Sequence, residues 1–310
     1  MRTIRSLLLA GLVAGLGAVP AVAQERISIG TGGTGGLFYV IGAGVADVLN
    51  QHMPGATARA EVTGASVENI RRVAAGQMTF GFSSSSTLYE ATVGEGPFDS
   101  PLPVSGIAYL YPAVLQVATT ADTGITAFEG LDGKRINLGP PGSNSAVLVQ
   151  RMLEAYGIFN PANVQFLSYT EGTSALMNGT IDATVVLAGA PTAALIDLGA
   201  QRDMRLLSVE EDRLAEMLAR YPYYQIYAIE AGTYEGQAEP VIAINDPAAL
   251  FTSNDASDET IYQITRTIFE NLPQLGEVHP QARAIALETA TELPVALHPG
   301  AQRFFDEAGQ

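Results

Sequence analysis

Five short segments of the chain combine small residues with hydroxyl side chains, and each follows a predicted β-strand. They lie at residues 32–36, 64–66, 83–86, 142–145 and 170–174. Small residues allow a ligand to approach the backbone closely. Where such a segment leads into a helix, the unpaired N–H groups and the positive end of the helix dipole favour a carboxylate or another oxyanion. One such segment is common in ordinary turns. Five of them, at equivalent positions of the two repeated α/β units described below, favour a binding site.

The sequence gives little support for a catalytic site or a metal-binding site. The chain has no Cys, and its three histidines, His52, His279 and His298, do not stand at metal-ligand spacing. No G-x-S-x-G motif surrounds the four serines at 83–86, and we expect His52 and His279, which lie close to prolines, to end helices. The sequence therefore predicts no catalytic residue, no metal and no cofactor. The open alternative is an exported hydrolase that uses a serine of Ser83–Ser86.

The segment at 30–35 (GTGGTG) also matches the G-x-G-x-x-G fingerprint of dinucleotide-binding proteins, with Glu61 at the position of the ribose acid. The pattern is weakly specific in a glycine-rich segment, and an exported protein does not normally meet a nicotinamide cofactor. No Lys-Ser/Thr follows, so the segment is not a P-loop.

The N-terminal 23 residues have the pattern of a secretory signal peptide. Arg2 and Arg5 precede an apolar stretch at 7–19, and A-V-A at 21–23 is a cleavage signal, so we expect cleavage after Ala23 and a periplasmic protein. The apolar stretch is shorter than the ~20 residues that a membrane span needs. The net charge of −16 disfavours nucleic acid as a partner.

The spacing of apolar residues predicts the same order of elements twice. The first unit has strands at 26–30, 58–62 and 78–82, with helices at 37–51 and 67–75 between them, and Ser66 as the N-cap of the second helix. The second unit has strands at 135–139, 164–168 and 181–187 and helices at 146–156 and 173–177. A chain of 310 residues also exceeds one ordinary core. We therefore predict two similar α/β lobes, with the ligand at the carboxyl ends of their parallel strands.

Apolar strands at 113–119 and 224–230 are suited to cross between the lobes. A strand at 241–244 and a helix at 258–272, with Ser257 as its cap, follow the second crossing. The first lobe is then expected at 24–117 and 236–310, and the second lobe at 118–235.

Several segments together resemble a known family. They are GTGGTGGLFY at 30–39, TGASVENI at 63–70, GKRINLGPPG at 133–142, AGTYEGQ at 231–237 and LHPGA at 297–301. In this order they resemble the TAXI receptors, which are the extracytoplasmic solute-binding proteins of TRAP-type transporters. The resemblance covers nearly the whole chain after residue 23. It implies a two-lobed type II periplasmic-binding-protein fold that closes on a small carboxylate, such as glutamate or 2-oxoglutarate, and delivers it to a TRAP-type membrane permease.

The turn chemistry and the resemblance together predict the ligand-binding residues. They are Gly33, Thr34, Gly35, Tyr39, Ser66, Ser83, Ser84, Ser143, Asn144, Ser145, Tyr169 and Gly189. The predicted partners are a small organic anion or amino acid and the permease.

The chain departs from the family pattern at two of its turns. Relatives commonly read V-Q-S-D where this chain has four serines at 83–86, and P-G-S-G-T where it has PGSNS at 141–145. The missing Gln and Asp leave the identity of the ligand open. The turns also lack Arg and Lys, and we expect Lys134 and Arg135 at the far end of their strand. An anion is then held by backbone N–H groups, hydroxyls and Tyr39.

Overall fold

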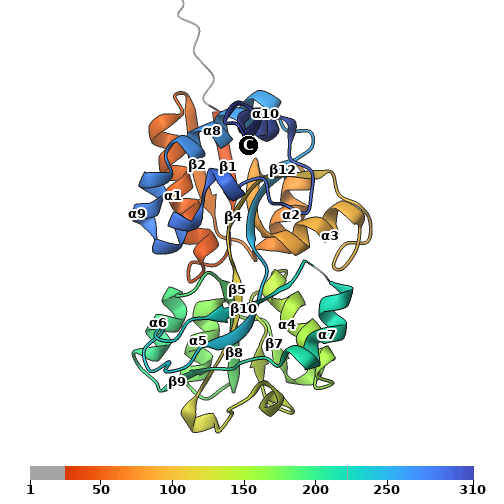
Figure 1. Ribbon diagram of the computed structural model, residues 1–310, viewed down its shortest axis with the longest axis vertical. Helices are drawn as coiled ribbons and strands as arrows, with labels where there is room; N and C mark the ends of the chain where they lie inside the picture. Colours follow the sequence, from red (N-terminus) through yellow and green to blue (C-terminus); the bar gives the residue numbers. More distant parts are fainter. Residues whose placement is uncertain (1–24, 222) are drawn as a thin grey trace, which may run out of the picture.

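The computed structural model describes residues 25–221 and 223–310, and the expected signal peptide at 1–23 lies outside them. Figure 1 shows two lobes, one above the other, and the chain passing between them near the middle. Strand β1 (Glu25–Gly30) and helix α10 (Pro299–Glu307) both lie in the upper lobe, which we call the first lobe. None of the described helices is long and apolar enough to cross a membrane.

The first lobe is built on a five-stranded sheet of order β2-β1-β3-β12-β4. Its remaining strands are β2 (Ala56–Glu61), β3 (Phe80–Ser84), β4 (Val104–Tyr111) and β12 (Ala248–Ser253). Strand β1 pairs in parallel with both β2 and β3, whereas β12 is antiparallel to β3 and to β4. Its helices are α1 (Leu37–His52), α2 (Ser66–Ala74), α3 (Ser85–Val93), α8 (Asp258–Glu270), α9 (Leu272–Val278) and α10.

The second lobe is built on a seven-stranded sheet of order β10-β11-β5-β8-β6-β7, with β9 paired to β5. Its strands are β5 (Val114–Thr120), β6 (Ile136–Asn137), β7 (Val164–Gln165), β8 (Ala183–Ala188), β9 (Met204–Leu206), β10 (Gln225–Ile229) and β11 (Val241–Asn245). Its helices are α4 (Asn144–Ala155), α5 (Tyr169–Met177), α6 (Ala193–Gly199) and α7 (Glu211–Arg220). Short 3-10 turns lie at Ala121–Thr123, Phe128–Leu131 and Pro161–Asn163 here, and at Pro280–Ala284 and Leu287–Thr289 in the first lobe.

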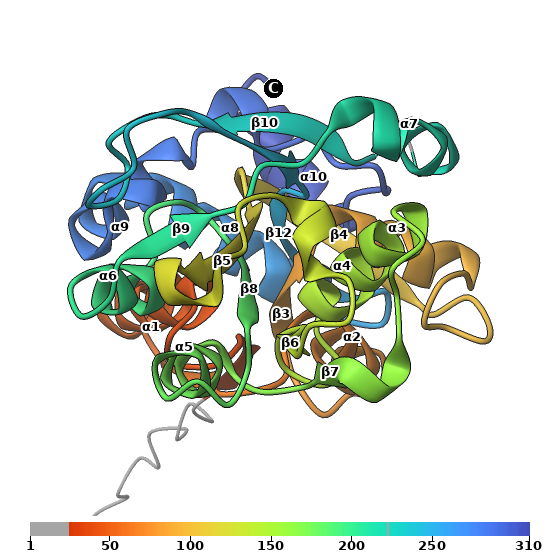
Figure 2. The same cartoon turned by 90° about the horizontal axis from the view of Figure 1, so that it is seen from below.

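The two lobes repeat one arrangement, as the sequence predicts. Strand β6 pairs in parallel with β7 and β8, just as β1 does with β2 and β3. In each unit the first strand is therefore central and its carboxyl end faces the same edge as those of its neighbours. Figure 2 shows the lobes from below, with α5 and α6 in front of α1, and α4 in front of α2 and α3. The turns after these strands meet where the lobes face each other.

Two links join the lobes, and one of them differs from the expectation. The first runs from β4 to β5 through Ala113, and the second from β11 to β12 through Asp246; the Asp246 N–H donates to the Ala113 carbonyl at 2.8 Å. The expected crossing at 224–230 is wrong, because β10 pairs antiparallel with β11 at the edge of the second sheet. Strands β5 and β11 both belong wholly to the second sheet. The chain therefore passes from one lobe to the other near residues 112–113 and 246–247, rather than at the expected boundaries 117 and 236.

Apolar packing explains the principal helices. Helix α1 buries Leu37, Ile41, Val45, Val48 and Leu49. Helix α8 begins after Ser257, whose hydroxyl accepts from the Thr260 N–H, as predicted. Two hydrophobic clusters belong to the second lobe alone, whereas the largest cluster joins first-lobe residues such as Phe82 to second-lobe residues such as Leu195. The described lobes are therefore packed against each other.

Candidate functional site

A small cavity lies between the lobes at the starts of several helices. Leu37, Ser66, Asn144 and Tyr169, the first residues of α1, α2, α4 and α5, line it, as does Ser84, the N-cap of α3. The first turn of a helix leaves N–H groups without an intrahelical partner and carries the positive end of the dipole. Five helix N-termini thus converge on one cavity. Its lining is completed by Gly32, Gly33, Gly36, Phe38, Ala65, Pro140, Ser143, Ser145 and Leu187.

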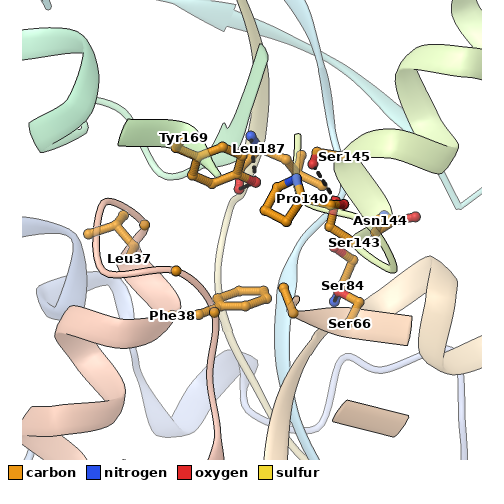
Figure 3. A pocket seen from close by; sticks show the side chains of 14 residues that line it. Leu37, Phe38, Ser66, Ser84, Pro140, Ser143, Asn144, Ser145, Tyr169 and Leu187 are labelled. Atoms are coloured by element: carbon orange, nitrogen blue, oxygen red, sulfur yellow. Dashed lines mark hydrogen bonds between the residues drawn. The ribbon is translucent and has the colours of Figure 1, made fainter. Parts of the chain in front are cut away.

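The cavity is narrow in this arrangement of the lobes (Figure 3). The space open to the centre of a water molecule is about 20 Å³. One water needs about 10–15 Å³ on the same measure. The described form is therefore closed, and a solute enters only when the lobes separate.

Five residues with hydroxyl groups line the cavity: Ser66, Ser84, Ser143, Ser145 and Tyr169. The Ser143 hydroxyl donates to the Pro140 carbonyl at 2.7 Å, and its oxygen lies 2.8 Å from the hydroxyl oxygen of Ser145. The Ser84 N–H donates to the Ser66 hydroxyl at 3.0 Å. The Ser84 hydroxyl is buried and has no hydrogen-bond partner among the described residues. It is a donor available to a ligand.

Tyr169 forms one wall of the cavity (Figure 3). Its hydroxyl lies 3.2 Å from both the carbonyl oxygen and the amide nitrogen of Leu187, and its ring lies 3.3 Å from the position that a side chain on Gly36 would occupy. Burial raises the pKa of the Tyr169 hydroxyl, so the group stays protonated and neutral.

The rest of the wall is apolar, and none of the lining residues is charged. Leu37, Phe38, Pro140 and Leu187 contribute carbon surface, and the Phe38 ring packs on Phe82 with ring centres 5.4 Å apart. Arg135, which the sequence predicted at the far end of its strand, lies away from the cavity, as expected. Arg135 pairs with Asp182 at 2.7 Å before β6, at the end opposite the cavity.

Seven of the predicted ligand-binding residues line the cavity. They are Gly33, Ser66, Ser84, Ser143, Asn144, Ser145 and Tyr169. The other five do not. Thr34 is exposed, Tyr39 lies one position past the lining residue Phe38, and the Ser83 hydroxyl donates to the Ser84 carbonyl at 2.9 Å.

Gly35 and Gly189, the remaining two, are close-packing positions. A side chain on Gly35 would come within 2.5 Å of the Thr170 hydroxyl oxygen of the second lobe, and one on Gly189 within 2.5 Å of Gln281 in the first lobe. These glycines bring the two lobes together.

Sequence reasoning missed the apolar wall. Leu37 and Phe38 fit the buried face of a helix, and nothing in their spacing separates a core residue from a cavity residue. Ser66 also differs from its predicted role. It is the first residue of α2, and Ala65 is the N-cap, with a φ of 70° that is unusual for a residue other than glycine.

Helix α2 is capped by the opposite lobe. The N–H groups of Val67 and Glu68 donate to the Gly142 carbonyl at 3.0 and 3.3 Å. Ala65 offers no side-chain oxygen, so the carbonyl from the second lobe satisfies donors that the helix itself leaves open. A side chain on Gly64 would come within 2.4 Å of the Pro141 carbonyl oxygen, so only glycine permits this approach.

Behind the cavity, Asp246 of the second link bonds to both lobes. Its carboxylate accepts from the N–H of Ser86 at 3.1 Å, from the Ser86 hydroxyl and from the Asn144 amide. The side chain is fully buried, and this burial raises the pKa of the Asp246 carboxyl to about 7.

A second polar contact between the lobes lies on α3 and α4. Arg151 pairs with Glu90 at 2.7 Å and donates to the Tyr224 hydroxyl at 2.8 Å, while Tyr223 donates to Glu90. The Arg151 guanidinium also stacks on the Tyr221 ring at 4.1 Å. These tyrosines therefore pack around an ion pair that joins the lobes.

The residues that the sequence offered for catalysis, metal binding or a cofactor take part in other contacts. The histidines bond elsewhere: His52 ends α1 and contacts Gln274, and His279 and His298 accept from the N–H groups of Gln281 and Gly300. No group of acidic or histidine side chains that could hold a metal ion occurs in residues 25–221 and 223–310. Glu61, the candidate ribose acid, pairs with Arg72 at 3.0 Å.

Comparison with known families decides the relationship. Residues 29–309 match the model of the NMT1-like family. The chain belongs to the NMT1-like family.

Solved structures show the fold of this NMT1-like protein. It is similar to the periplasmic binding protein BugD, with 12% identity, a TM-score of 0.58, and coverage of 92% of this chain and 94% of that chain. A putative L-cystine ABC transporter from Listeria monocytogenes has 13% identity, a TM-score of 0.52, and coverage of 87% and 99%. An ancestral arginine-binding protein bound to arginine has 12% identity, a TM-score of 0.52, and coverage of 83% and 98%. The two-lobed periplasmic-binding-protein fold expected from the sequence is confirmed.

Proposed function

We propose that this protein is an extracytoplasmic solute receptor that captures a small carboxylate between its lobes and delivers it to a TRAP-type membrane permease. The observation that carries the proposal is the convergence of five helix N-termini on one uncharged cavity between the lobes. In the closed form, N–H groups at the starts of α2 and α3 are bonded to Gly142 and Asp246, so the starts of α1, α4 and α5 are the ones offered to the ligand. Backbone N–H groups at helix starts stabilise an anion without a basic side chain. The solute-binding fold of the structural neighbours supports the same reading.

The proposed ligand-binding residues are the seven predicted ones that line the cavity. The hydroxyls of Ser66 and Ser84 donate to the carboxylate together with helix N–H groups, whereas the Ser143 hydroxyl already donates to the Pro140 carbonyl. Hydrogen bonds to a charged group are worth about 1.5–3 kcal/mol each. The fully buried Asp246 lies behind this wall, where it holds Ser86 and Asn144 in place.

The test is a screen of small carboxylates by thermal unfolding, with glutamate, 2-oxoglutarate, pyruvate and lactate as the first compounds. A receptor gains stability as RT ln(1 + [L]/Kd), about 2.7 kcal/mol at a hundredfold excess over Kd. Stabilisation without chemical change of the compound supports a receptor, whereas turnover would indicate an enzyme.

Export and the permease are tested separately. We propose that the chain is cleaved after Ala23, so mass spectrometry of the protein from the periplasmic fraction should find Gln24 at the N-terminus. Proteoliposomes that contain a TRAP-type permease should take up the identified solute only when the receptor is added. Uptake without the receptor would argue against a delivery role.

A further inference from the structure

The cavity offers neutral donors to a ligand but no negatively charged acceptor. Ser84 has an unused hydroxyl, which can donate or accept, and the starts of α1, α4 and α5 add backbone N–H groups, whereas those of Val67 in α2 and Ser86 in α3 are already bonded. The unpartnered amide oxygen of Asn144 belongs to a side chain that is turned away from the cavity in Figure 3. The neighbouring carbonyls each accept one hydrogen bond already: the Pro140 carbonyl from Ser143, and the Gly142 carbonyl from Val67. The Leu187 carbonyl is likewise within hydrogen-bond distance of the Tyr169 hydroxyl.

The acids near the cavity are also engaged. Asp246 is fully buried, and its oxygens accept from Ser86 and from Asn144, whose side chain is turned away from the cavity in Figure 3. Glu90 is bonded to Arg151 and Tyr223 through Oε1, and although its Oε2 has no described partner, Glu90 does not line the cavity. No acidic side chain belongs to the lining of the cavity.

An ammonium group requires the opposite arrangement. It carries a positive charge and three donors and has no acceptor. Placed in this cavity, it would lose its water and meet helix dipole ends of the same sign, without a carboxylate to compensate it. The apolar surfaces of Leu37, Phe38 and Leu187 suit the carbon skeleton of a ligand instead.

From these observations we infer that the ligand is a short monocarboxylate with an apolar carbon skeleton and no ammonium group, such as a 2-oxo or 2-hydroxy acid. The inference rests on the proposed receptor function and narrows its ligand class. The small size of the closed cavity favours a short skeleton. The carboxylate lies at the helix starts, and the skeleton lies against Phe38.

The experiment compares acids that differ in one group. Isothermal titration calorimetry is run on the full mature chain with pyruvate, lactate and alanine, and with 2-oxoglutarate and glutamate. We expect pyruvate or lactate to bind at least about a hundredfold more tightly than alanine, because an unpaired buried charge costs several kcal/mol. We also expect either short acid to bind more tightly than 2-oxoglutarate.

The outcomes separate the inference from the proposed function. If alanine binds as tightly as pyruvate, or glutamate as tightly as 2-oxoglutarate, the exclusion of ammonium is wrong while the receptor function stands. If 2-oxoglutarate binds and the short acids do not, the assignment of a short monocarboxylate is wrong. If none of the five compounds binds, the proposed capture of a small carboxylate fails as well.

A substitution tests the cause of the selectivity. Ser84→Asp places an acceptor on the cavity wall, so the ratio of pyruvate to alanine affinity should fall at least tenfold. Ser100→Asp, at an exposed position of the same lobe, is the matched control and should leave the ratio unchanged. An unchanged ratio in a folded Ser84→Asp chain would overturn the explanation. The ligand pairs decide the inference even if this variant does not fold.

Discussion

Asp246, which lies on a link between the lobes, forms hydrogen bonds with both of them. Its carboxylate accepts hydrogen bonds from Ser86 at the start of α3 and from Asn144 at the start of α4. One side chain therefore fixes a helix start in each lobe. Because Asn144 also lines the cavity, the position of this carboxyl bears directly on the site.

Titration of Asp246 should reduce stability as the pH rises. Burial raises its pKa to about 7, so the folded chain holds this proton more tightly than the unfolded chain does. The stabilisation of the folded chain by this tightly held proton is largest in acid. It is lost between about pH 4 and about pH 7, the range between the unfolded and folded pKa values of the carboxyl. Asp246→Asn removes this titration. Urea unfolding at about pH 5 and about pH 7.5 should show a greater loss of unfolding free energy for the native chain than for Asp246→Asn.

The matched control for that experiment is Asp99→Asn, which removes an exposed carboxyl from the first lobe. It should follow the native chain at both pH values. Equal pH dependence of the native chain and Asp246→Asn would contradict the assignment.

A second prediction at this scale concerns Ser84. Its hydroxyl bonds to no described residue, so Ser84→Ala should leave the free energy of unfolding nearly unchanged. The same change removes a donor to the charged ligand, and the affinity for the acid that binds best should fall roughly tenfold or more. Calorimetry and urea unfolding measure the two effects.

Tyr39→Phe is the control for Ser84→Ala. Tyr39 was predicted from the sequence as a donor but does not line the cavity, so its hydroxyl should not matter. The arrangement is wrong if Tyr39→Phe weakens binding and Ser84→Ala does not.

At the scale of elements, glycines allow the two lobes to meet. The turn before α2 approaches the second lobe at Gly64, and the turn before α1 approaches it at Gly35. The carbonyl of Gly142 then completes the first turn of α2. Closure thus satisfies backbone donors that a separated α2 leaves to water or to a ligand.

Gly64→Ala should hinder closure without disrupting either lobe. The added methyl group would lie 2.4 Å from the Pro141 carbonyl oxygen, and backbone there cannot move without shifting the second lobe. We expect at least tenfold weaker ligand binding and a nearly unchanged circular dichroism spectrum. Gly199→Ala, whose nearest neighbour is 3.8 Å away, is the control and should bind normally. Normal binding by Gly64→Ala would show that this contact is not needed.

Elements whose apolar residues are regularly spaced were predictable from the sequence, and other elements were not. The apolar spacing of α1 and α8 and the two repeated units correspond to the structure within a few residues. The strand at 224–230 was predicted correctly and is β10, but its role as a crossing between the lobes was wrong, because an apolar run does not reveal which strand it pairs with. The hydroxyl-rich turns indicated the site through their small, polar residues. The apolar wall at Leu37 and Phe38 and the bonds of Asp246 depend on contacts between distant segments, which one sequence does not display.

At the scale of the whole molecule, the closed cavity requires motion. A space of about 20 Å³ admits no organic acid from solution, so the lobes must separate about the two links. Small-angle scattering of the ligand-free chain should give a larger radius of gyration than at saturation with the best ligand. A radius that stays constant at proven saturation would contradict the two-lobed closure.

The place of β12 has a consequence for how the chain is made. Residues 248–253 form a strand between β3 and β4, so the first lobe lacks an inner strand of its sheet until nearly all of the chain has been synthesised. The second lobe, from β5 to β11, is continuous and needs no later residue for its sheet. Pairing across such a long separation is slow. A nascent chain that ends before residue 248 therefore carries one lobe with a complete sheet and another in which β3 has an unpaired edge and β4 has no partner strand. The last-made fifth of the protein decides when the binding site first exists.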